Sequence, residues 1–200
     1  MDHIKIGVVA ETLTPFCYHS LAVYRGTATL PELIGDRAIA FGLAATLGML
    51  RASVILPPKD YLTHLRAMPF RTSMFITREP ELLPPVIRRL NLDGEGGYQE
   101  NIRNVINRGN LAAFFQTQEV PPGKRFTGAI FGYDPFKEAK QNQLVIRVGL
   151  HRNGMVLLKQ ADDQALTVRL NAATAKLFGR ELSPDSKQPN SKTMERYCLH

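Results

Sequence analysis

The clearest pattern of apolar and polar positions lies in Leu144–Lys159, LVIRVGLHRNGMVLLK. Two strand-like runs meet at Asn153-Gly154, the dipeptide that best supplies the two positive φ angles of a type I′ turn. The pattern therefore predicts a β-hairpin with a two-residue loop. The pairs expected from that turn are Arg152–Met155, Leu150–Leu157 and Val148–Lys159.

Strand alternation gives this hairpin one apolar face, which we expect to point into the core. The other face carries Arg147, Gly149 and His151. A glycine inside a strand often marks the close approach of another backbone, and beside Arg147 and Arg152 we predict a phosphate backbone. An ordinary hairpin with a solvated outer face is the alternative. The residues expected on the apolar face are Ile146, Val148, Leu150, Met155 and Leu157.

The rest of the chain alternates between strand-like and helix-like patterns, which favours the α+β class. Asp36 is the expected N-terminal cap of the first helix, whose Gly42 and Gly48 would permit close packing on a sheet. The predicted strands are His3–Phe16, Leu21–Thr29, Arg51–Leu56, Phe70–Thr77 and Val86–Leu92, and the predicted helices are Ala38–Leu50, Lys59–Met68 and Leu166–Phe178.

A second hairpin is predicted over Leu111–Gly132, with Pro121-Pro122-Gly123 as its turn. Just past the tip, two cations and an aromatic residue form a combination suited to phosphate contacts and base stacking. A solvated tip with the aromatic ring tucked inward is the alternative. The candidate RNA contacts here are Lys124, Arg125 and Phe126, and two further strand-end candidates are Arg25 and Arg71.

The segments group into one domain, residues 1–180, with an insertion around 93–132. The insertion begins at Asp93–Gly97, DGEGG, the segment with the strongest signal for flexibility in the chain. Residues 181–200 are rich in Ser, Pro, Lys, Gln and Asn, so we expect a flexible tail.

Composition and charge point to a soluble protein with an anionic partner. The chain has 200 residues, 44% of them hydrophobic, a net charge of +7 and a pI near 9.6. A positive net charge of this size indicates a polyanionic partner, most simply nucleic acid. The alternative is that the excess charge serves solubility alone. The apolar run Ala38–Leu50 is too short to span a bilayer and the start carries no secretory signal, so we expect a cytoplasmic location and no membrane partner. Cys17 and Cys198 are expected to be reduced thiols.

The sequence contains few signals for catalysis. The chain lacks phosphate-loop, nucleophile-elbow and zinc-protease motifs, its five histidines are scattered, and we expect no metal or other cofactor. One set could cut RNA without metal, since Tyr, Lys and His can serve as base, acid and phosphate clamp. Its members would be Lys59, Tyr61 and His64; an ordinary exposed helix face is the alternative.

Three stretches, in this order, resemble the RAMP proteins of CRISPR systems. They are GDRAIAFGLAATLG over Gly35–Gly48, PPKDYLTHLRAMPFRTSMFIT over Pro57–Thr77, and IRVGLHRNG over Ile146–Gly154. The chain is most similar to the Cas-five family, in the short form of type I-D effector complexes. Residues 93–122 and the tail after Glu181 depart from the family pattern.

The resemblance implies a ferredoxin-like, RRM-like βαββαβ core with an inserted β-hairpin thumb. It also implies a non-catalytic subunit of the Cascade complex, which caps the 5′ handle of the crRNA, meets target DNA indirectly, and contacts the large subunit and first backbone subunit. Carried onto this chain, Arg147, Gly149 and Arg152 fall where the family's hairpin meets RNA. Two other functions stay open: a metal-independent endoribonuclease that processes precursor crRNA, and a basic module that binds only proteins.

Overall fold

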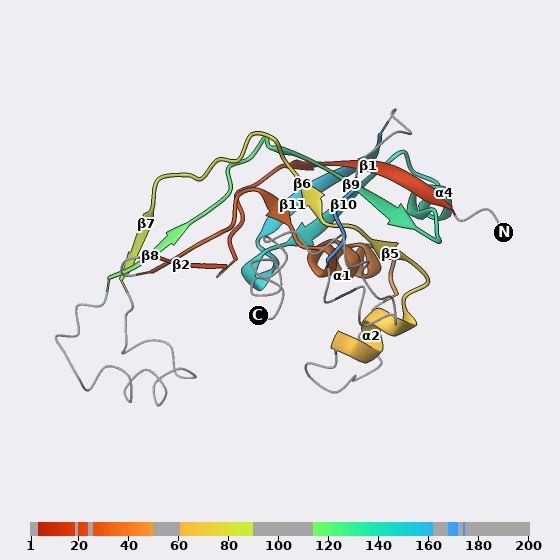
Figure 1. The fold of residues 1–200 in the computed structure, drawn as a ribbon, viewed down its shortest axis with the longest axis horizontal. Helices are drawn as coiled ribbons and strands as arrows, with labels where there is room; N and C mark the ends of the chain where they lie inside the picture. Colours follow the sequence, from red (N-terminus) through yellow and green to blue (C-terminus); the bar gives the residue numbers. More distant parts are fainter. Residues whose placement is uncertain are drawn as a thin grey trace, which may run out of the picture.

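The computed structural model describes residues 4–18, 20–23, 26–49, 61–89, 114–161, 168–171 and 174. Of the predictions above, Arg25, Arg51–Leu56, the segment around Asp93–Gly97 and the C-terminal tail lie outside these residues. The helix predicted over Leu166–Phe178 lies mostly outside them. The described strands form two sheets, and the helices are few and short (Figure 1).

The larger sheet has seven strands in the order β10-β11-β1-β9-β6-β4, with β5 also paired to β9. All of its pairings are antiparallel. β1 lies at its centre because apolar residues alternate along that strand and bury Ile6, Val8 and Ala10 on one face. The strands are β1 Lys5–Thr12, β4 Leu33–Ile34, β5 Arg71–Thr72, β6 Phe75–Ile76, β9 Arg125–Phe131, β10 Gln143–Val148 and β11 Gly154–Gln160.

The smaller sheet has four strands in the order β2-β3-β8-β7. It extends to one end of the molecule, away from the helices (Figure 1). The single extended segment predicted over Leu21–Thr29 is instead a tight pair, with Val23 opposite Gly26. The strands are β2 Leu21–Val23, β3 Gly26–Ala28, β7 Val86–Arg89 and β8 Phe114–Gln118.

Helix α1 spans Asp36–Thr46 and lies against β10. Gly42 makes this possible, because a Cβ there would sit 2.9 Å from the carbonyl oxygen of Arg147. The close packing predicted for Gly42 is confirmed, whereas Gly48 has open space around it and a φ of +70°, which suits the residue just past a helix end. Thr46 donates a hydrogen bond to the carbonyl of Val145 at 3.0 Å, so the last turn of α1 satisfies an acceptor on edge strand β10.

The prediction that Asp36 caps α1 is wrong. Gly35 is the N-cap residue and provides no side-chain bond, while Asp36 is the first helical residue and is buried. Its Oδ1 accepts hydrogen bonds from the backbone N–H of Arg37 and from Nδ2 of Asn171. The carboxylate thus fixes a C-terminal segment to the start of α1. The remaining helices are α2 Tyr61–Ala67, α4 Pro135–Ala139 and the short 3₁₀ turn η1 Leu150–Arg152.

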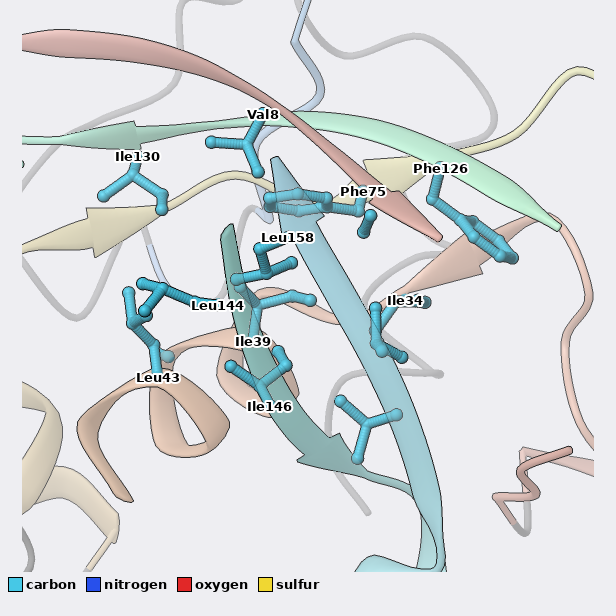
Figure 2. Close-up of a cluster of buried hydrophobic side chains, with 14 of the residues drawn as sticks. Val8, Ile34, Ile39, Leu43, Phe75, Phe126, Ile130, Leu144, Ile146 and Leu158 are labelled. Atoms are coloured by element: carbon cyan, nitrogen blue, oxygen red, sulfur yellow. The ribbon is translucent and has the colours of Figure 1, made fainter. Parts of the chain in front are cut away.

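The hydrophobic core lies between the larger sheet and α1 (Figure 2). Each strand contributes alternate residues to this core, and α1 contributes one face of the helix. The labelled members of this cluster are Val8, Ile34, Ile39, Leu43, Phe75, Phe126, Ile130, Leu144, Ile146 and Leu158.

The hairpin predicted over Leu111–Gly132 is wrong. β8 belongs to the smaller sheet, and β9 belongs to the larger one, where it pairs with β1 over seven residue pairs. The chain crosses between the sheets near Val120, which forms an isolated bridge with Phe16. Pairing with the central strand places β9 over the core, where Phe126 and Ile130 on its inner face are fully buried.

The strand predicted over Phe70–Thr77 is interrupted between β5 and β6. Ser73 bonds Ala129 twice, donating from its backbone N–H at 2.9 Å and accepting at its hydroxyl at 2.8 Å. Met74 pairs instead with Arg169. The chain is α+β, as predicted, and its curled antiparallel sheet is compatible with a ferredoxin-like fold.

Candidate nucleic-acid interface

β10 and β11 form the predicted antiparallel hairpin, but its register and its turn differ from the prediction. Val148 pairs with Gly154 and Arg147 with Met155. Residues 149–153 therefore form the connection, with η1 inside it, and Asn153 has a right-handed φ of −76°. The two-residue type I′ turn at Asn153-Gly154 is wrong.

This register also changes which side chains face the core. On β10 the inward residues include Ile146 and Val148, as predicted, but on β11 they are Val156 and Leu158. Met155 and Leu157, predicted to point inward, share the outer face with Arg147. The true register is offset from the predicted one by an odd number of residues, and such a shift moves a strand's side chains to the opposite face.

Gly149 is held by a segment of this same chain. Its φ of 85° and ψ of 174° define a backbone conformation that is essentially restricted to glycine. A Cβ there would lie 3.1 Å from Cβ of Phe16 and 3.2 Å from the carbonyl oxygen of Cys17. The Gly149 N–H donates to the Tyr18 hydroxyl at 2.8 Å, and the Leu150 N–H donates to the Cys17 carbonyl at 2.8 Å. The backbone that approaches Gly149 closely in this structure is that of residues 16–18 of the same chain.

Tyr18 connects this contact at Gly149 to further residues. Its ring packs edge-on against Phe16, and its backbone N–H donates to the Thr29 hydroxyl at 2.8 Å. Burial raises the pKa of Tyr18 to about 12, so the phenol is neutral when it accepts the Gly149 bond. Because this value lies above the ordinary pKa of 10.0, the stability that Tyr18 contributes is intact below about pH 10 and is lost as the pH rises through about 12.

We expect Gly149→Ala to lower the free energy of unfolding by about 1–3 kcal/mol, because alanine is strained at this positive φ and its added Cβ would meet Phe16. Chemical denaturation checks this. Gly123→Ala is the matched control, since Gly123 also has a positive φ but a Cβ added there would meet no atom within 4 Å. An equal loss for both variants would mean that the contact with Phe16 has no energetic role.

Arg147 and Arg152 are both exposed, which leaves their guanidinium groups accessible to a ligand. Arg147 projects from the outer face of β10, and Arg152 lies in the connection with a positive φ of 56°. The side chain of His151 lies outside the described set. Among the hairpin candidates whose side chains are described, both arginines are therefore accessible to phosphates.

Of the other predicted RNA contacts, one has an accessible side chain and two are engaged in contacts within the protein. Arg125 has a side chain that is 75% exposed, with its Nε 3.9 Å from Glu11. Lys124 forms an ion pair with Glu81 and is mostly covered. Arg71 donates to the carbonyls of Met68 and Phe70 at 2.6 and 2.7 Å, and burial lowers its pKa.

The base-stacking role predicted for Phe126 is wrong. Its ring is fully buried in the core, and the inward-facing alternative is the one observed (Figure 2). Phe126 alternates with exposed Arg125 at the start of β9, so the neighbouring cation and aromatic point to opposite faces of the sheet.

Three strand registers bring the predicted contacts Arg125 and Arg147 onto one face with residues that sequence reasoning missed. Leu157 lies opposite Glu11, and Glu11 lies opposite Arg125, so these side chains share the side of the sheet that faces away from α1. We call this side the open face and define it by its charged and aromatic members. They are Lys5, Glu11, Arg125, Phe131, Arg147 and Lys159. The outward position of Lys5 was visible from strand alternation, but the cross-strand neighbours were not.

The set suggested for metal-free RNA cleavage is described only in part. Lys59 and the side chain of Tyr61 lie outside the described residues. The His64 ring packs on Phe41 with centroids 6.2 Å apart, and its Nε2 is buried without a hydrogen-bond partner among the described residues. Within the same residues, no three His, Cys, Asp or Glu side chains gather as metal ligands, and no helix is long and apolar enough to cross a membrane.

Comparison with known proteins gives structural likenesses only. No family model matches the chain, and no curated protein does. One similar chain belongs to the "Type III-B Cmr-beta bound to cognate target RNA and AMPPnP", with a TM-score of 0.46 and 16% identity over 80% of this protein. Another belongs to a "Type IV-B CRISPR Complex", with a TM-score of 0.45 and 12% identity over 82% of this protein and 92% of that chain. The alignment with the Type III-B chain covers 64% of that chain's length. At these TM-scores the likenesses carry no part of the functional argument.

Proposed function

We propose that this protein is a non-catalytic RNA-binding subunit of a CRISPR effector complex. The observation that carries the proposal is the position of Arg147 and Arg152, both exposed at the end of a hairpin whose strand β11 pairs with the central strand β1. They lie within Ile146–Gly154, the stretch that resembles the Cas-five family. The net charge of +7 supports a polyanionic ligand.

The proposal extends to the finer assignments of that family. The protein would cap the 5′ handle of the crRNA in a cytoplasmic Cascade complex and contact the large subunit and first backbone subunit. The strand order β11-β1-β9-β6, with α1 between β1 and β5, supports a ferredoxin-like core. Short α4 and strand β10 occupy the connection where a second long helix would be expected.

Removing both hairpin cations tests the RNA-binding role. We expect Arg147→Ala with Arg152→Ala to weaken binding of a labelled single-stranded RNA about 25-fold at 0.1 M salt, because two phosphate contacts are lost. Fluorescence anisotropy over a salt series measures this, and the slope of log affinity against log salt should fall by about 1.4. Binding that is unchanged would remove the hairpin from the RNA site.

The matched control removes two exposed cations elsewhere, Arg78→Ala with Lys137→Ala, which causes the same loss of net charge. This variant should bind RNA more tightly than the hairpin variant does. Equal weakening by both variants would indicate a nonspecific effect of charge.

The assignment to a CRISPR complex has its own test. The tagged chain, purified with its native partners, should carry short RNAs that share one 5′ end. RNAs with ragged ends, or no RNA, would count against crRNA capping. Incubating the purified chain with repeat RNA in the presence of a chelator separates binding from cleavage, and we expect the RNA to stay intact.

A further inference from the structure

The open face of the larger sheet carries more positive than negative charge. Lys5, Arg125, Arg147 and Lys159 all project from it, and Glu11 is the carboxylate among them. The face is formed by β10, β11, β1 and β9, while α1 lies on the opposite side (Figure 1), where the core side chains also lie. These cations come from four different strands, so they spread across the sheet and do not form one cluster.

Glu11 lies between two of these cations and holds neither of them tightly. Its Oε2 is 3.9 Å from Nζ of Lys159 and 3.9 Å from Nε of Arg125. The side chains of the two cations are 42% and 75% exposed. Exposed pairs at this distance contribute little to stability, so both cations can turn to another anion at small cost.

The surface between the cations is partly apolar. Phe131 faces outward at the end of β9, half-buried and opposite Lys5, and Leu157 lies beside Glu11. An aromatic ring beside cations on a sheet is an arrangement that stacks unpaired bases and binds the phosphates between them. Along β1, the six steps from Lys5 to Glu11 span about 20 Å. The four strands that form the open face are as many as in RNA-binding sheets whose aromatic residues stack two or three bases.

We propose that the open face binds single-stranded RNA, as a continuation of the path that begins at Arg147. This inference rests on the RNA-binding function proposed above and specifies where the ligand lies. Charge complementarity selects a polyanion over a neutral or basic protein. The position of Glu11 adds a specific feature, since its carboxylate competes with phosphate for Lys159 and Arg125.

Glu11→Gln is the decisive variant because it should strengthen binding. Removing the carboxylate frees both cations and removes a repulsive charge. We expect about fivefold tighter binding to a labelled single-stranded RNA at 0.1 M salt, which is the effect of one net contact. Glu138→Gln, at an exposed position of α4, is the matched control with the same change in net charge, and it should have less effect.

Two variants test the opposite direction. Lys159→Ala should weaken binding about fivefold, compared with a smaller effect of Lys137→Ala on α4. Phe131→Leu should weaken binding at high salt as well as at low salt, because stacking does not depend on counterion release. Thermal melting of each variant checks that the fold is intact.

The outcomes separate this inference from the function on which it rests. If the hairpin variant weakens binding while Glu11→Gln and Lys159→Ala match their α4 controls, the open face is excluded and the RNA-binding role stands. If the unmodified protein does not bind RNA, the proposed function itself is overturned. Tighter binding by Glu11→Gln than by Glu138→Gln supports the open face.

Discussion

Replacing Phe126 by alanine is expected to lower the free energy of unfolding by about 3–5 kcal/mol. The ring is fully buried at the start of β9 and belongs to the main hydrophobic cluster. Its removal loses the transfer free energy of a large apolar side chain and leaves a cavity that the surrounding sheet cannot close. Chemical denaturation of the purified protein measures the loss.

Two other substitutions make this expectation specific to the core. Phe126→Leu keeps most of the apolar volume and should lose much less stability. Arg125→Ala, one residue earlier on the exposed side, should change stability by less than about 0.5 kcal/mol. If Phe126→Ala were as stable as the unmodified protein but bound RNA weakly, the ring would be a ligand contact and not a core residue.

The elements that could be predicted from the sequence are those whose signals are local. Alternation along Ile4–Thr12 gives a half-buried strand, and the small residues around Gly42 give a helix that packs closely. The exposure of Arg147 also follows from alternation within one strand. In each case a periodic pattern within about ten residues contains the information.

The register of the β10–β11 hairpin could not be predicted in this way. Asn153-Gly154 favours a tight turn locally, but Phe16 packs against both Gly149 and Gly154 and opens the loop to five residues. Tyr18, 131 residues before Gly149, then supplies the hydrogen bond that fixes the loop. Contacts at such separations decide the register, and turn propensity does not report them.

The candidate site was predicted only in part for the same reason. Arg147 was predicted on the outer face of a strand and Arg125 just past a hairpin tip, but their relation depends on β9 pairing with β1 and β1 pairing with β11. Those pairings place Glu11 and Lys159 between them. Treating β8 and β9 as one hairpin put Lys124, Arg125 and Phe126 at a common tip, although one of them is in the core.

Gly128 is the other position where a small change should have a large effect. It lies opposite Val8 in the central strand pair, and the ring of Phe75 crosses it from β6. A Cβ at this residue would sit 2.7 Å from two ring atoms of Phe75, which is fully buried. We expect Gly128→Ala to cost about 1–3 kcal/mol through overpacking. Equilibrium denaturation measures it.

The cause can be isolated by changing Phe75 as well. Phe75→Leu shortens the side chain that occupies the space above Gly128, so the double variant should lose less stability than the two single variants combined. Residues in direct contact typically show a coupling free energy of about 0.5–3 kcal/mol in such a cycle. A coupling near zero would place the cost of Gly128→Ala in the pairing of β9 with β1. A clear coupling would instead establish that Gly128 is glycine because the Phe75 ring needs its space, which makes the centre of the sheet a packing site rather than a flexible one.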